Sequence, residues 1–77
     1  MTVIGALVRL KETQHNAARQ RLEQLPGVTP FDLGDASRLG LVIECDRLDD
    51  AYRLLDKDIR GAPGVLCVYP AYAEFES

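Results

Sequence analysis

Few side chains in this 77-residue chain are of the types that perform covalent or metal chemistry, and none is spaced for it. Cys45 and Cys67 lack the C-x-x-C spacing of a redox or metal pair, and two cysteines cannot form the disulfide framework of a small secreted domain. His15 is the only histidine, and we expect it to be exposed. Nucleophilic catalysis needs a nucleophile, a base and an orienting group close together, and these residues do not predict such a group. The sequence therefore favours a protein that is not an enzyme and that holds no metal or cofactor.

Composition and charge limit the classes of ligand and partner that we expect the chain to bind. The segment "LKETQHNA" has no glycine and carries Glu12, so it does not predict an anion-binding loop, and no Gly-rich nucleotide motif occurs. A net charge of −3 argues against nucleic acid and suits cationic partners better. No apolar run approaches the roughly 20 residues of a membrane span. The N-terminal "MTVIGALVRLKE" has no basic residue ahead of its apolar stretch, so we expect no signal peptide and a cytoplasmic protein with reduced thiols.

The elements follow from a tripeptide, Pro-Gly-Val, that occurs at 26–28 and again at 63–65. Each copy ends a helical pattern and begins a β-branched, apolar one, as expected where proline stops a helix and glycine turns the chain. In the first half we predict a strand at Thr2–Leu10, a helix capped by Thr13 with an apolar stripe of Ala18, Leu22 and Leu25, and a strand at 28–34. Pro30 places that last strand at a sheet edge.

The second half repeats the pattern. We predict a strand at Arg38–Cys45 that forms a hairpin with the preceding strand, a helix capped by Asp46, and a last strand at 65–75. The helix stripe consists of Leu48, Ala51, Tyr52, Leu55 and Ile59. The order βαββαβ predicts one domain over residues 1–77, an α+β ferredoxin-like sandwich. Its antiparallel sheet would have strand order 4-1-3-2, with both helices on one face.

In this fold the other face of the sheet is bare, and alternation along the strands predicts which residues it presents. The helix-facing set would be Ile4, Ala6, Val8, Leu39, Leu41, Ile43, Val68, Pro70 and Tyr72, with Cys45 also toward the helices. The open face would carry Val3, Gly5, Leu7, Arg9, Arg38, Gly40, Val42, Glu44, Cys67, Tyr69 and Ala71.

The middle of the predicted open face is apolar, with two glycines on the central strands. Gly5 and Gly40 would leave a shallow trough, since glycine in a strand interior often marks a close approach of another chain. They could equally relieve sheet twist, or the face could be a dimer interface. The acids that end the third strand, Glu44 and Asp46, could serve only helix capping and solvation. Arg9 and Arg38 would repel a cationic ligand on this face, unless they lie at the end of the face opposite the acids or pair with acids.

The chain resembles the NapD family, cytoplasmic assembly chaperones of the periplasmic nitrate reductase. The resemblance covers nearly the whole sequence, and its most specific parts are "PGVLCVYPAYAEFE" at the C-terminus and the "LPGV" that closes the first helix. It implies a protein without catalysis or cofactor that binds the twin-arginine signal peptide of the nitrate reductase catalytic subunit. The peptide would be held as a helix, and export delayed until the molybdenum cofactor is loaded.

A twin-arginine peptide has a cationic front and an apolar body, so its receptor needs an apolar surface with carboxylates near one end. We expect Glu44, and less directly Asp46, to meet the arginine pair. An effector-binding or dimerisation domain of the βαββαβ regulatory type is the alternative. The predicted signal-peptide-binding residues are Val3, Gly5, Leu7, Gly40, Val42, Glu44 and Tyr69.

Overall fold

Four strands form one antiparallel sheet in the computed structural model, which describes residues 1–75. They are β1 (Thr2–Leu10), β2 (Val28–Asp32), β3 (Arg38–Cys45) and β4 (Val65–Phe75), in the order β2-β3-β1-β4. This order is 4-1-3-2 read from the other edge, so the predicted topology is confirmed. The edge strands are β2, which contains Pro30, and β4, and each follows a helical segment in the chain.

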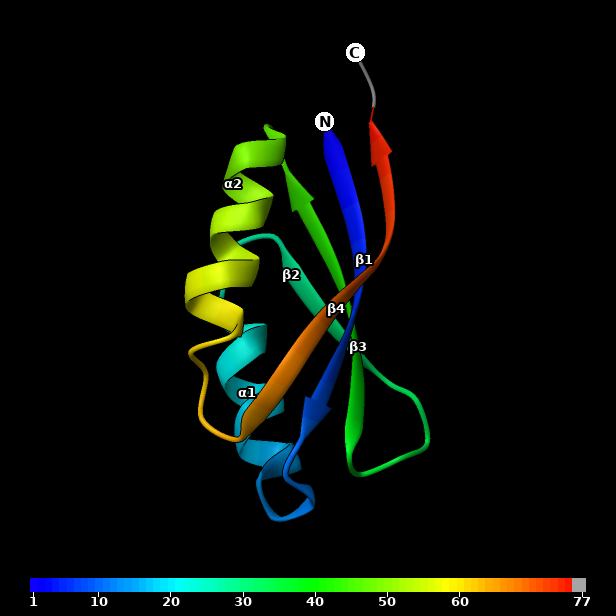
Figure 1. Cartoon of the computed structure of the whole chain (residues 1–77), viewed down its shortest axis with the longest axis vertical. Coiled ribbons are helices and arrows are strands. Elements are labelled where there is room, and N and C mark those ends of the chain that lie inside the picture. The colour runs from blue at the N-terminus through cyan, green and yellow to red at the C-terminus, as the bar shows by residue number, and fades with distance from the viewer. Residues whose placement is uncertain (76–77) are drawn as a thin grey trace.

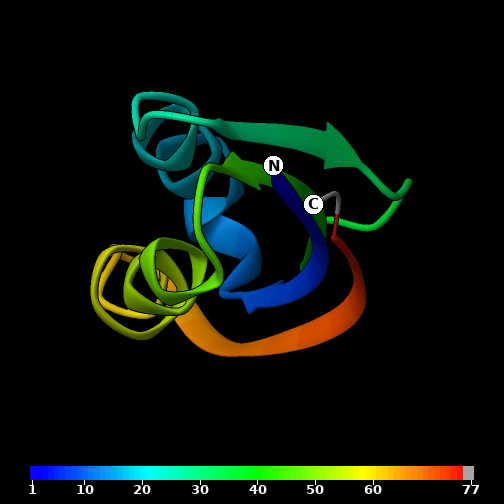
Figure 2. The ribbon, with the colours of Figure 1, turned by 90° about the horizontal axis from the view of Figure 1, so that it is seen from above.

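Both helices lie on the same side of the sheet (Figures 1 and 2). The chain enters α1 (His15–Glu23) through a 3₁₀ turn, η1 (Glu12–Gln14), and α2 (Leu48–Arg53) continues as a π-helical segment, η2 (Leu54–Ile59). Seen from above, the sheet curls around the helices and leaves its outer face bare (Figure 2). The fold is therefore α+β and ferredoxin-like. Within the described part of the chain, no helix is long and apolar enough to cross a membrane.

The core lies between the helices and the sheet face that carries alternate residues of β1 and β3. All six predicted helix-facing residues of these two strands are buried, at 5% exposure or less. Ala18 and Leu22 of α1 cover them, with Ala51, Leu55 and Ile59 of α2 and η2. Period-two alternation thus assigned the faces of the central strands correctly.

The two Pro-Gly-Val turns have matching geometry. Gly27 has φ 76° and Gly64 has φ 82°, in the region that favours glycine. The Gly27 carbonyl accepts the Glu44 N–H at 2.8 Å, and the Gly64 carbonyl accepts the Lys11 N–H at 2.9 Å. Each turn is therefore tied to a strand or strand end of the other half, so the repeated tripeptide closes one sheet.

The helix starts differ from those predicted. Thr13 lies inside η1, and the residue before α1 is Gln14; α2 is preceded by Arg47 rather than Asp46. Neither Gln14 nor Arg47 forms a side-chain capping hydrogen bond. Both capping predictions were wrong, because the residue that precedes each helix lies one position further along the chain than the predicted cap. Tyr52, predicted to lie in the apolar stripe of this helix, is 51% exposed.

The pairing of β4 with β1 is irregular, and one predicted face depends on it. Register shifts occur between Gly5 and Ala6 and between Arg9 and Leu10, so Pro70 lies opposite Ala6 and Tyr72 opposite Gly5. Directly opposed residues of an antiparallel pair share a face. The register position of Tyr72 is thus opposite Gly5, while the predicted helix-facing orientation of its side chain lies outside what the structure describes.

Candidate functional site

The register brings the seven predicted binding residues together on the open face. Three pairs of them lie directly opposite each other between β1 and β3: Val3 with Glu44, Gly5 with Val42, and Leu7 with Gly40. Tyr69 of β4 lies opposite Leu7 on the other side. We call this set the open-face strip. The strands that position it pack from behind on the buried core.

The strip is apolar along its middle and accessible along most of its length. Val3, Leu7 and Val42 are half-buried, while Tyr69 is 48% exposed. Phe31 of β2 lies opposite Gly40 and is 43% exposed, so it adds a second aromatic side chain to the strip. Two exposed aromatic rings on one sheet face are unusual for a solvated surface and are typical of interaction sites.

The trough predicted at Gly40 is not open. A Cβ atom at this position would lie 2.2–2.8 Å from three ring atoms of Phe31, and Gly40 itself is buried. The lack of a side chain at Gly40 therefore accommodates the Phe31 ring of the neighbouring strand. Aromatic cover of a strand glycine is a known stabilising arrangement in sheets. The prediction failed because it considered the two central strands without the edge strand that pairs with one of them.

One end of the strip is acidic. Glu44 lines a hollow of about 460 Å³ together with Asp46 and Asp50, and none of its described lining residues is a lysine or arginine. Cys45 and Leu54 form an apolar part of the same hollow. Burial raises the pKa of the Cys45 thiol, and the negative charges of Asp50 and Asp46 raise it further. The hollow thus combines three carboxylates with apolar surface and is also lined by the N-terminal residue Met1; carboxylates beside apolar surface suit a cationic side chain with a long aliphatic stem.

The opposite end of the strip is basic. Arg9 lies directly opposite Arg38 on β3 and opposite Cys67 on β4. Cys67 Sγ and Tyr69 Oη share a hydrogen bond of 3.2 Å. This contact raises the pKa of the Tyr69 phenol, an effect that Arg9 opposes. The two arginines are thus at the far end from Glu44, and Arg38 also pairs with Asp35, its Nε lying 3.0 Å from Asp35 Oδ2.

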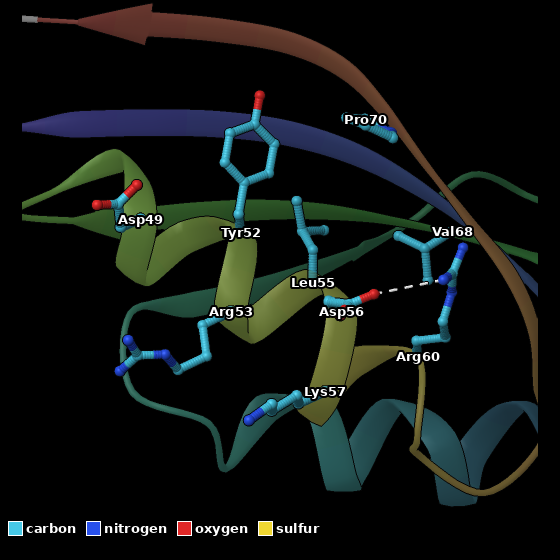
Figure 3. A pocket seen from close by; sticks show the side chains of 9 residues that line it. All are labelled: Asp49, Tyr52, Arg53, Leu55, Asp56, Lys57, Arg60, Val68 and Pro70. Atoms are coloured by element: carbon cyan, nitrogen blue, oxygen red, sulfur yellow. Dashed lines mark hydrogen bonds and ion pairs between the residues drawn. The ribbon is translucent and has the colours of Figure 1, made fainter.

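A separate groove, not predicted from the sequence, lies between α2–η2 and β4 (Figure 3). It encloses about 510 Å³ and has Tyr52, Leu55, Val68 and Pro70 as its apolar lining. Tyr52 points from α2 toward β4, and Arg60 Nη1 lies 3.4 Å from Asp56 Oδ1 at the rim (Figure 3). Arg53, Lys57 and Arg60 outnumber its two acids. This groove is less suited to a cationic ligand than the acidic hollow.

His15 is not exposed as expected. Its side chain is 17% exposed, and its Nε2 lies 3.9 Å from Oδ1 of Asp32, which also pairs with Arg19. These residues join α1 to the end of β2 and explain the position of His15 structurally. Among residues 1–75 no three His, Cys, Asp or Glu side chains gather in a way that could hold a metal ion.

Sequence reasoning missed two contributors to the site. Phe31 could have been found from the hairpin, since an aromatic residue on the edge strand faces a glycine when the loop is short. Asp50 is not among the predicted binding residues, and its place in the hollow depends on how α2 packs against β3. On β4, Glu74 is the register partner of Val3.

The architecture defines a ferredoxin-like βαββαβ domain with an apolar open face that is acidic at one end and basic at the other. No protein-family model and no curated protein matches the chain. Among solved structures, it is similar to the E. coli Tat proofreading chaperone NapD, with 24% identity and a TM-score of 0.81, over 96% of this chain and 78% of NapD.

Two further structures share the fold at lower identity. A hypothetical protein from Pyrococcus horikoshii has a TM-score of 0.86 and 17% identity, with 100% of this chain and 93% of that chain covered. A protein from Thermus thermophilus has a TM-score of 0.86 and 15% identity, with 100% of this chain and 96% of that chain covered. At these identities the similarity establishes a fold that NapD also has.

Proposed function

We propose that this chain is a cytoplasmic chaperone that binds the twin-arginine signal peptide of a periplasmic nitrate reductase catalytic subunit and delays export until the enzyme has its cofactor. In this role it performs no catalysis and needs no cofactor of its own. The similarity to NapD, a Tat proofreading chaperone, supports the proposal. The observation that carries it is that Glu44 belongs both to the open-face strip and to the lining of the acidic hollow.

The chemistry of such a peptide matches this surface. Its two guanidinium groups would meet the carboxylates of Glu44, Asp46 and Asp50, and charge-assisted hydrogen bonds between Arg and carboxylate are among the stronger ones in proteins. Its apolar segment would cover Val3, Leu7 and the two exposed aromatic rings. The cationic groove beside α2 would repel the same peptide, so electrostatics favours one face over the other.

Titration of a twin-arginine peptide into isotope-labelled protein tests the proposal. We expect amide shifts along the open-face strip, at Val3, Gly5, Val42 and Glu44, and little change at Tyr52 and Val68 in the other groove. A peptide with both arginines replaced by glutamine is the matched control and should bind more weakly. Shifts confined to the groove, or no binding at millimolar peptide, would contradict the proposal.

Substitution of Glu44 tests the acidic end by itself. Charge-assisted hydrogen bonds contribute about 1.5–3 kcal/mol, so Glu44→Gln should weaken binding of the twin-arginine peptide about tenfold. Glu23→Gln, on the exposed end of α1 behind the sheet, makes the same change in net charge and should leave the affinity unchanged. Equal losses in the two variants would point to a long-range charge effect and against a contact at Glu44.

The alternative, a dimerisation or effector-binding domain, makes a different prediction for the same face. The exposed Phe31 and Tyr69 rings would then be covered by a second copy of the chain. Sedimentation equilibrium of the free protein distinguishes the two functions. A stable dimer whose interface includes Tyr69, and which the peptide does not dissociate, would favour the alternative.

A further inference from the structure

The helix layer covers the sheet unevenly. α1 packs against β2, and α2 packs against β3 and β1. On β4, Val68 and Pro70 lie opposite Val8 and Ala6 of β1, which places them on the helix side of the sheet. Val8 and Ala6 are buried in the core, but Val68 is only half-buried and Pro70 is exposed. The groove of about 510 Å³ between α2–η2 and β4, which we call the α2–β4 groove, thus lies where the helices cover the sheet incompletely (Figure 3).

One wall of the α2–β4 groove is the part of the helix stripe that the core does not bury. Ala51, Leu55 and Ile59 of that stripe are buried, whereas Tyr52 is 51% exposed and points toward β4 (Figure 3). Tyrosine combines a large apolar ring with a polar tip and is enriched at protein interfaces. The wall continues into η2, and π-helical segments are rare and frequently occur at functional sites. The groove therefore has two features typical of interaction surfaces.

The rim of the α2–β4 groove is cationic, although the chain has a net charge of −3. It is lined by three cations and two acids, Arg53, Lys57, Arg60, Asp49 and Asp56. Arg60 pairs with Asp56, its Nη1 lying 3.4 Å from Oδ1. Among the side chains that the structure describes, no carboxylate forms an ion pair with Arg53 or Lys57. Two positive charges are thus available to an occupant, and carboxylates beside apolar residues would complement the groove.

The distribution of these cations favours a peptide segment over a small molecule. Arg53 and Arg60 are separated by about 10 Å along the helix, at roughly 1.5 Å per residue. Arg53 and Lys57 extend away from β4, whereas Arg60 points toward Val68 (Figure 3). An occupant that contacts these charges and also covers Tyr52 must therefore extend over several residues.

Strand addition and membrane binding fit this region less well. β4 is an edge strand, but Pro70 has no N–H to donate, and the register shifts beside Ala6 and Leu10 interrupt its pairing. Proline and irregularities of this kind protect edge strands against a further strand. A bilayer binds apolar side chains that project into it, whereas those of the groove line a hollow that has acids on its rim. An occupant of the groove therefore docks through its side chains.

We propose that the α2–β4 groove is a second docking surface, which binds an amphipathic segment of a partner protein whose carboxylates flank its apolar side chains. The apolar side chains cover Tyr52, Val68 and Pro70, and the carboxylates meet the cations of the rim. The open-face strip lies on the other side of the sheet, so both surfaces can be occupied at once. The proposal goes beyond the proposed function and does not depend on it.

A synthetic acidic peptide tests the proposal. The probe has about 14 residues, long enough to follow α2–η2 as a helix, with leucines at helical spacing and glutamates beside them. The control peptide has lysine in place of every glutamate. In isotope-labelled protein, the glutamate peptide should shift the amides of Tyr52, Leu55 and Val68 and leave those of Val3 and Val42 unchanged. The lysine peptide should not shift the amides of the groove.

Three results of this titration would overturn the proposal. The first is equal shifts in the groove with both peptides, and the second is no shift there at millimolar glutamate peptide. The third is a larger shift of the same amides with phosphatidylglycerol vesicles, which would assign the groove to an anionic membrane. Sedimentation equilibrium adds one more test, because a stable dimer of the free protein that buries Tyr52 would identify a second copy of the chain as the occupant.

Substitutions locate the contact. Tyr52→Ala should weaken binding of the glutamate peptide about tenfold, as truncation of a central aromatic residue does at interfaces, whereas Tyr69→Ala on the open face should leave it unchanged. Arg53→Gln should weaken binding about two- to fivefold, the range of an exposed charge pair. Arg21→Gln, exposed on α1, makes the same change in net charge and should have no effect. Urea unfolding checks that all four variants are folded.

The same variants separate this proposal from the proposed function. Tyr52→Ala should leave binding of the twin-arginine peptide to the open-face strip unchanged. Equal losses of glutamate-peptide binding in Tyr52→Ala and Tyr69→Ala would overturn a separate docking surface. Failure of the twin-arginine peptide to bind, with the glutamate peptide still bound at the groove, would overturn the proposed function and support this surface.

Discussion

Phe31 occupies the surface above Gly40, and the two residues form one structural unit. A methyl group at Gly40 would lie 2.2–2.8 Å from ring atoms of Phe31, so Gly40→Ala must displace the ring into solvent. Overpacking of this kind costs about 1–3 kcal/mol. We expect Gly40→Ala to lose about 1 kcal/mol of unfolding free energy in urea, and much less when Phe31 is already alanine. Additive effects of the two substitutions would show that ring and glycine are independent.

Asp35 is the residue whose charge is most strongly supported by its neighbours. The Ser37 N–H and hydroxyl donate to Oδ1 at 2.8 and 2.7 Å, and Arg38 Nε donates to Oδ2 at 3.0 Å. These hydrogen bonds lower the pKa of Asp35 from 3.8 to about 2, and the one donated by the Ser37 N–H has the largest effect.

A lowered carboxyl pKa in the folded state makes stability depend on pH in one direction. The contribution of Asp35 is present in full above pH 3.8 and is lost as pH falls toward about 2. We expect Asp35→Asn to flatten the stability profile of the protein in that acidic window and to change its slope little above it. A carbon-detected titration of the Asp35 carboxyl gives the pKa directly. A midpoint near 3.8 in folded protein would contradict the hydrogen-bonded turn.

At the residue scale, the period-two alternation of side chains predicted the sheet face of some site residues but not of others. It placed Val3, Leu7 and Val42 on the open face correctly because β1 and β3 pair without interruption. It could not foresee the register shift of β4 between Gly5 and Ala6, since irregularities of this kind follow from tertiary packing. Phe31 was missed for a related reason, because its contact with Gly40 crosses to an edge strand.

At the scale of elements, Gly27 and Gly34 lie in two turns with similar backbone angles but differ in the space available for a side chain. Gly27 and Gly34 have nearly equal φ angles, 76° and 78°. A Cβ at Gly27 would lie 2.3 Å from the Glu44 carbonyl oxygen, whereas nothing lies within 4 Å of one at Gly34. Left-handed backbone costs a non-glycine residue about 1–2 kcal/mol, so Gly34→Ala should lose about that much.

Gly27→Ala should lose clearly more than Gly34→Ala, because the backbone must also move to relieve the contact with Glu44. Urea unfolding of both variants gives the difference. We expect Gly27→Ala to disturb the amide of Glu44, whose N–H bonds the Gly27 carbonyl at 2.8 Å, and so to weaken peptide binding. Equal losses of stability in the two variants would show that the turn can separate from β3 freely.

Elements were predicted well where a hydrophobic period is long and poorly where an end is decided by one hydrogen bond. The bounds Thr2–Leu10 and Arg38–Cys45 were both predicted and found. The helix ends were missed, since capping oxygens at Thr13 and Asp46 are only one solution for the first backbone N–H groups. The apolar stripe gives no signal for the π-helical winding of η2, in which Leu55 and Ile59 are buried.

At the scale of the molecule, the two ends of the open face adjoin different turns of the duplicated half-domain. The acidic end includes the Gly27 turn and the start of α2, and the basic end adjoins the β2–β3 turn, where Asp35 holds Arg38. Because Glu44 and the Arg9–Arg38 pair lie at opposite ends of β1 and β3, each charge can be altered without rebuilding the apolar strip. Substitutions at one end should therefore leave contacts at the other largely intact.

The same register separates the two cysteines across the whole molecule. Cys45 pairs with Thr2 and Cys67 with Arg9, at opposite ends of β1, so about 23 Å of strand lies between their partners at roughly 3.3 Å per residue. A disulfide requires Cα atoms within about 7 Å. Both cysteines are free thiols in the structure. We expect air-oxidised monomer to contain no Cys45–Cys67 bond by mass spectrometry of a non-reduced digest, and excess reductant to leave stability and peptide binding unchanged. An intramolecular bond in folded protein would require a different pairing of β1 with both of its neighbours.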